Sequence, residues 1–173
     1  MKPKITIIFG ALSLIAILFA LGYVDSKGAN TASVQGVGGS HPAKAESQLV
    51  AQETLYDFGT ISMKNGLATK EFTVANPTDT DVTVRTLLTS CMCTNAYLVK
   101  PNGAVKGPFG MPGMGYVPPV NERIKAGESR VIRVVYDPNA HGPAGVGRID
   151  RFVILTEEDG DELQLEIIAN VTP

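Results

Sequence analysis

The chain has 173 residues, of which 44% are hydrophobic, and this is enough for one ordinary domain with a core and a tail. The formal net charge is -2, and the stretch after residue 50 is weakly acidic. Such a domain lacks the positive surface that holds a phosphate backbone, so we expect no nucleic-acid partner. The two cysteines, Cys91 and Cys93, exclude a disulfide framework but allow one bond between them.

An apolar run from Ile5 to Val24 follows Lys2 and Lys4. A helix over this run would be about 30 Å long, close to the thickness of a hydrocarbon core. We expect residues 1–24 to be a transmembrane anchor or, alternatively, a signal peptide cleaved near Ala20-Leu21-Gly22. The lysines favour a cytoplasmic amino terminus with the domain on the extracytoplasmic side, or a secreted or periplasmic domain after cleavage. No cysteine follows the run, which excludes lipidation there.

Residues 25–48 are rich in Gly, Ser, Ala, Asn and Gln and show little apolar periodicity. This composition predicts a flexible linker. We expect no functional role for His41, which lies within it. Residues 49–173 then form the single globular domain.

The globular part consists of short alternating segments separated by Gly, Pro, Asn and Asp, a pattern typical of an all-β, Ig-like antiparallel β-sandwich. About seven strands are predicted: 53–58, 69–75, 81–89, 96–100, 129–136, 148–156 and 162–171. The last two should form a hairpin across the acidic turn 157–161. That turn could attract Ca²⁺, but its spacing matches no known calcium loop, and a solvated hairpin tip is the favoured interpretation.

Two local predictions concern the surroundings of the cysteines. In the strand 81–89, alternation places Val82, Val84, Thr86 and Leu88 on one face. Residues 101–120 contain five Gly and five Pro, so we expect a long loop without regular ladder pairing.

Several short motifs occur in a characteristic order: Tyr56-Asp57-Phe58-Gly59, Phe72-Thr73-Val74-Ala75-Asn76-Pro77 and Ser90-Cys91-Met92-Cys93-Thr94. With the later Ala126-Gly127-Glu128 and Tyr136-Asp137-Pro138, they resemble a bacterial family of Ig-like domains, domain of unknown function fifteen-seventy-three. That family is related to the ASPM, SPD-2 and Hydin domains. The resemblance implies an exported Ig-like sandwich without established catalysis. The family's Ser-Cys-Gly-Cys-Thr has Met92 in place of its glycine here.

The Cys-Met-Cys motif carries most of the chemistry that the sequence offers. If the motif is extended, both sulfurs project from the same face. Soft thiolate and thioether ligands select Cu(I), so one hypothesis is a copper site formed by Cys91, Cys93, Met111 and Met114, with Met92 and His141 in reserve. A second is dithiol redox chemistry through a Cys91–Cys93 disulfide. Zinc is disfavoured, because a closed zinc site needs four Cys or His ligands.

No nucleophile elbow, H-E-x-x-H sequence or phosphate-binding glycine loop is present. The favoured interpretation is therefore a membrane-tethered module with a structural or protein-binding role, no catalysis and no required cofactor. Its partner would be an unidentified protein of the cell envelope. The Cu(I)-binding protein and the dithiol redox protein remain alternatives.

Overall fold

The structure is a computed structural model and describes residues 47–173. The predicted anchor or signal segment, residues 1–24, and nearly all of the predicted linker lie outside the described residues. Within the described part, no helix is long and apolar enough to cross a membrane.

Ten strands and two short 3-10 helices make up the described part of the chain. The strands are β1 (Val50–Ala51), β2 (Leu55–Ser62), β3 (Ala68–Ala75), β4 (Val82–Thr89), β5 (Thr94–Val99), β6 (Val105–Phe109), β7 (Glu122–Ile124), β8 (Ser129–Tyr136), β9 (Gly147–Glu157) and β10 (Glu162–Thr172). The 3-10 helices are η1 (Met63–Asn65) and η2 (Gly142–Gly145).

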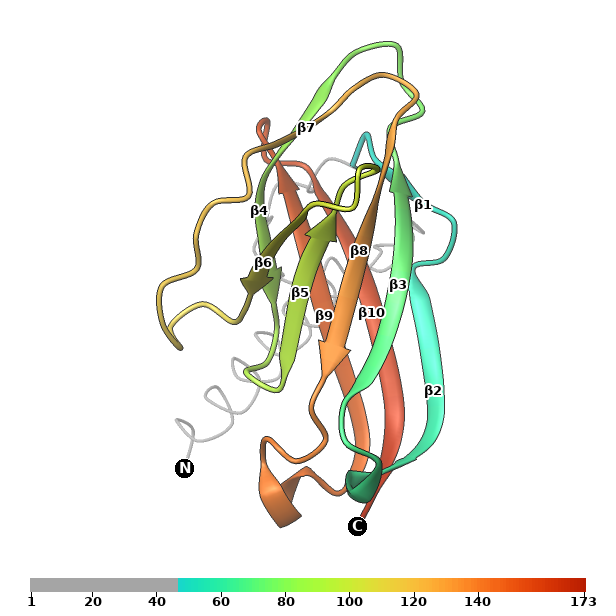
Figure 1. Cartoon of the computed structure of the whole chain (residues 1–173), viewed down its shortest axis with the longest axis vertical. Coiled ribbons are helices and arrows are strands. Elements are labelled where there is room, and N and C mark those ends of the chain that lie inside the picture. The colour runs from blue at the N-terminus through green and yellow to red at the C-terminus, as the bar shows by residue number, and fades with distance from the viewer. Residues whose placement is uncertain (1–46) are drawn as a thin grey trace, which may run out of the picture. The chain divides into compact units, whose positions relative to one another are not determined.

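The strands form two five-stranded sheets, in the orders β1-β3-β8-β5-β6 and β2-β10-β9-β4-β7. Figure 1 shows β3, β8 and β5 in front of β9 and β10, so the two sheets stack as a sandwich. The fully antiparallel prediction is wrong at one pair, because β2 runs parallel to β10. The predicted hairpin is confirmed, since β9 and β10 pair antiparallel from Glu162↔Thr156 to Val171↔Gly147.

Each of the seven predicted strands has a counterpart, namely β2, β3, β4, β5, β8, β9 and β10. The additional strands β1, β6 and β7 are short. The expectation of no ladder pairing over residues 101–120 is wrong for β6, which pairs with β5. The ladder tolerates Pro108 because β6 is an edge strand, where a missing N–H breaks no inner hydrogen bond.

The prediction that one face of β4 carries Val82, Val84, Thr86 and Leu88 is confirmed for Val82 and Val84, which are buried, but is wrong for the two later residues. A register shift in the β4–β9 ladder lies between Val84 and Thr86. After this irregularity Leu87 and Thr89 are buried, whereas Thr86 and Leu88 are only half-buried. A bulge of this kind reverses the alternation of the residues that follow it.

An ion cluster around the buried carboxylate of Glu122 joins the two sheets at the edge formed by β6 and β7. The carboxylate of Glu122, on β7, binds Arg130 Nε at 2.9 Å, Lys106 Nζ at 2.8 Å and Lys100 Nζ at 3.1 Å. Burial of Glu122 favours its neutral form, but hydrogen bonds from Lys106, Arg130 and Lys100 outweigh burial and lower its pKa to about 2. Lys106 also donates to the carbonyl of Val120, which fixes the end of the loop between β6 and β7.

Candidate functional site: the cysteine turn

Cys91 and Cys93 lie in a tight turn between β4 and β5, and they are disulfide-bonded with Cα atoms 5.3 Å apart. The Thr94 amide donates to the Cys91 carbonyl at 3.1 Å and closes the turn. The buried hydroxyl of Thr89 lies 3.1 Å from the carbonyl oxygen of Cys91 and 3.0 Å from that of Thr94. The motif is therefore not extended, and the i,i+2 strand geometry does not describe it.

Hydrogen bonds to β9 and to the end of β8 hold the turn in place. Ser90 and Phe152 bond each other twice, through the Ser90 amide to the Phe152 carbonyl and the Phe152 amide to the Ser90 hydroxyl, both at 2.9 Å. The Asp137 amide donates to the Cys93 carbonyl at 2.8 Å. The disulfide thus sits on a rigid part of the sandwich rather than in a free loop.

Two basic side chains, distant in sequence, meet the two sulfurs. His141 Nε2 lies 3.2 Å from Cys91 Sγ, and Arg151 Nε donates to Cys93 Sγ at 3.3 Å. His141 immediately precedes η2 and is exposed, whereas Arg151 lies on β9 and is partly buried. Each sulfur therefore has its own polar neighbour.

The two cysteine residues differ in their exposure to solvent. Cys91 is 9% exposed and Cys93 only 1%. Tyr136 is also buried close to the turn, since it pairs with Thr94 in the β5–β8 ladder. Burial raises the pKa of the Tyr136 phenol, although the nearby charge of Arg151 opposes this rise.

Ligand atoms of Cys91, Cys93 and His141 all lie within 4.8 Å of one another. His141, a reserve ligand in the sequence hypothesis, is thus the donor that the fold brings to the thiol pair. After reduction, two thiolates and an imidazole would form a three-ligand site suited to a soft ion.

The predicted methionine ligands gather around a separate pocket of about 330 Å³. Met92, Met111 and Met114 line it together with Tyr116, whereas Cys91 and Cys93 do not. Met111 and Met114 lie at the two ends of a turn, in which the Met114 amide donates to the Met111 carbonyl at 3.4 Å. Gly113 in this turn has φ +86°, a conformation open to glycine without steric cost. The four-sulfur copper site remains a prediction.

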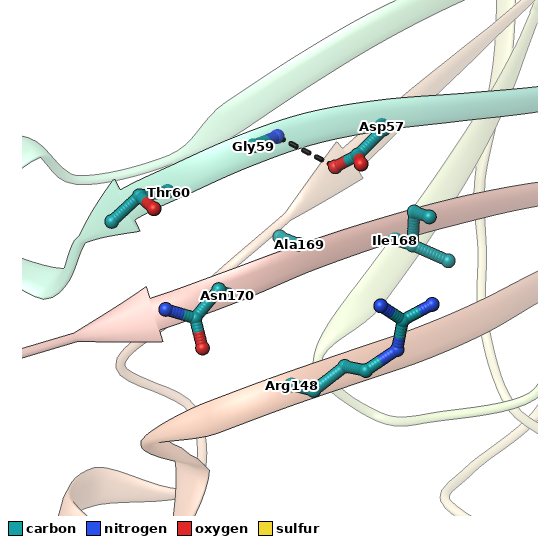
Figure 2. A pocket seen from close by; sticks show the side chains of 7 residues that line it. All are labelled: Asp57, Gly59, Thr60, Arg148, Ile168, Ala169 and Asn170. Carbon is teal, nitrogen blue, oxygen red and sulfur yellow. Dashed lines mark hydrogen bonds between the residues drawn. The ribbon is translucent and has the colours of Figure 1, made fainter.

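A second hollow of about 320 Å³ lies over β2, β10 and β9. Figure 2 shows Asp57, Asn170 and Arg148 around it, and Asp57 accepts a hydrogen bond from the Gly59 amide at 2.7 Å. It contains no sulfur or imidazole group. It therefore adds nothing to the chemistry of the cysteine turn.

Sequence reasoning missed Arg151, because the basic residues nearest to the cysteines along the chain are Arg85 and Lys100. Arg151 could have been found only from the pairing of β4 with β9. Their ladder pairs Thr89 with Val153, and the same antiparallel register continued by two residues sets position 91 opposite position 151. Knowledge of that register would have placed a guanidinium beside the thiols.

No protein-family model matches the chain, and no curated protein matches it. Among solved structures, it is similar to a protein of unknown function from Porphyromonas gingivalis W83, with 15% identity and a TM-score of 0.52 over 76% of this chain and 51% of that one. The secreted serine protease VesC from Vibrio cholerae shows 12% identity and a TM-score of 0.45 over 72% and 24% of the two chains. The periplasmic chaperone SfaE shows 11% identity and a TM-score of 0.39 over 72% and 58%.

The chain spans about half the length of the Porphyromonas gingivalis protein that it matches. At this level of identity, that likeness supports the sandwich fold alone. The resemblance to domain of unknown function fifteen-seventy-three remains a prediction.

Proposed function

We propose that this chain is a membrane-tethered, extracytoplasmic Ig-like module that exchanges its Cys91–Cys93 disulfide with the thiols of a partner protein. The observation that carries the proposal is the contact of each sulfur with a basic group, His141 at Cys91 and Arg151 at Cys93. A purely structural disulfide needs neither group. The apolar run after Lys2 and Lys4 supports the proposed tether and location.

The different environments of the sulfurs give them different roles in the exchange. A thiolate of the partner attacks Cys91 Sγ, because Cys91 is the more exposed of the two cysteine residues. The Cys91–Cys93 bond breaks, and Cys93 leaves as a thiolate that the guanidinium of Arg151 stabilises. The partner's second thiolate then attacks its own sulfur in the mixed disulfide, and Cys91 leaves. His141 is placed to give Cys91 a proton, so the partner dithiol ends as a disulfide and the cysteine pair ends reduced.

Single-cysteine variants of the full chain test these roles. In Cys93→Ser the remaining Cys91 thiol should form a mixed disulfide with oxidised glutathione at least about ten times faster than Cys93 does in Cys91→Ser, because access limits exchange. Mass spectrometry of quenched samples follows both reactions. Equal rates, or a faster reaction of Cys93, would contradict the assigned roles.

A second candidate function is binding of Cu(I) by the reduced pair, and the Cys91–Cys93–His141 cluster favours it. Anaerobic loading of the reduced chain should give stoichiometric copper that is lost in Cys91→Ser with Cys93→Ser. His141→Ala should weaken binding if the clustered donors hold the ion, and Met111→Leu with Met114→Leu should weaken it if the four sulfurs do. Copper retained at full stoichiometry in the double serine variant would refute both donor sets.

A further inference from the structure

The hairpin tip between β9 and β10 has a feature that a solvated acidic turn does not explain. Glu157, the last residue of β9, is only 2% exposed. Its Oε1 accepts hydrogen bonds from the Ser47 hydroxyl and, at 3.3 Å, from the Leu49 amide. Its Oε2 is buried and has no hydrogen-bond partner among the described residues. An ionised oxygen left in this state is costly, unless a cation neutralises it.

Two further carboxylates lie close to the carboxylate of Glu157. Ligand oxygens of Glu157, Asp159 and Asp161 all lie within 4.8 Å of one another. The turn is ordered by its backbone, since the Glu157 amide donates to the Asp161 carbonyl at 2.8 Å and the Gly160 amide to the Glu157 carbonyl at 3.2 Å. Asp159 accepts from the Asp161 amide and from the Gln48 side chain, which leaves lone pairs on both of its oxygens.

We propose that Glu157, Asp159 and Asp161 form a binding site for a hard divalent cation, with Ca²⁺ as the ion that its chemistry fits best. The donors are all carboxylate oxygens, which Ca²⁺ accepts in irregular geometry, whereas Mg²⁺ demands a near-ideal octahedron. Soft ions are disfavoured, because no sulfur or imidazole belongs to the cluster.

The cation would also fasten the first described residues of the domain to the hairpin. Ser47 and Leu49 bind Glu157, and Gln48 binds Asp159 with its amide nitrogen at 2.9 Å. A bound ion holds both carboxylates in the positions that these contacts need. The site therefore fixes where the predicted linker leaves the sandwich, at the end of the hairpin.

Calcium titration of the detergent-solubilised full chain, stripped with EGTA and followed by thermal unfolding, tests the site. We expect a rise in Tm of roughly 5 °C at 10 mM Ca²⁺, on the basis of a dissociation constant on the order of 1 mM or below. The same concentration of Mg²⁺ should give a smaller rise. Isothermal titration calorimetry with Ca²⁺ alone measures the affinity directly.

Glu157→Gln removes the buried charge and should abolish the calcium response, while its Tm in EGTA stays equal to that of the wild type or higher. Asp161→Asn tests the same site without touching the contacts of Ser47 and Leu49. The matched control is Glu158→Gln, since exposed Glu158 pairs with Arg85 and is not in the cluster. A wild-type Tm that Ca²⁺ leaves unchanged, or an equal rise in all three variants, would overturn the proposal.

Discussion

The chemistry of the cysteine turn depends on single contacts between side chains that are far apart along the chain. Cys91 and His141 are 50 residues apart, and Cys93 and Arg151 are 58 apart. The sequence shows two thiols and two histidines but not which basic group reaches which sulfur. A guanidinium or imidazolium beside a sulfur stabilises the thiolate, which is both the attacking and the leaving form in exchange. Arg151 and His141 therefore make the Cys91–Cys93 bridge a candidate for thiol–disulfide exchange.

At the level of the elements, the cluster around Glu122 fixes the loop that carries the methionines. Glu122 lies on β7, Lys106 on β6 and Arg130 on β8, so one carboxylate connects strands of both sheets. Removing one member of a buried charge cluster leaves the others uncompensated and is strongly destabilising. The three-residue strand β7 and the loop before it are the elements most dependent on this carboxylate.

The depressed pKa of Glu122, about 2 against an ordinary value of 4.5, makes stability depend on pH. The folded state holds this proton less tightly than the unfolded chain, so the contribution is full above pH 4.5 and is lost as the pH falls towards 2. The loss amounts to about 3 kcal/mol. Urea unfolding of Glu122→Gln at pH 7 should show a destabilisation of about that size and a flatter stability curve between pH 4.5 and 2.

Glu71→Gln is the control for this measurement, because Glu71 pairs with Arg133 at the surface. Exposed pairs contribute about 0 to 1 kcal/mol, so this variant should keep the acid dependence of the wild type. An unchanged acid dependence in Glu122→Gln would show that other groups control the acid response.

For the whole molecule, period-2 alternation was enough to predict seven strands and the sandwich. The long hairpin was the clearest case, because Leu165, Ile167, Ala169 and Val171 of β10 are buried and alternate with residues that are half-buried or exposed. The parallel pairing of β2 with β10 and the bulge in β4 could not be predicted, since both depend on contacts between distant strands. For the same reason the sequence supplied Cys91, Cys93 and the reserve ligand His141 but not Arg151, and it did not reveal the burial of Glu157.

We expect Arg151 and His141 to make the Cys91–Cys93 pair exchange readily, and the reduction potential of this pair tests that expectation most directly. In glutathione redox buffers, the full chain should interconvert reversibly with a potential above about -300 mV, the range below which structural disulfides lie. Arg151→Met should lower the potential by about 30 mV, a tenfold change in the equilibrium. Arg148→Met, an exposed arginine on the same strand, should leave it unchanged. A wild-type reduction potential below about -300 mV would contradict the account, and so would an Arg151→Met potential equal to that of the wild type.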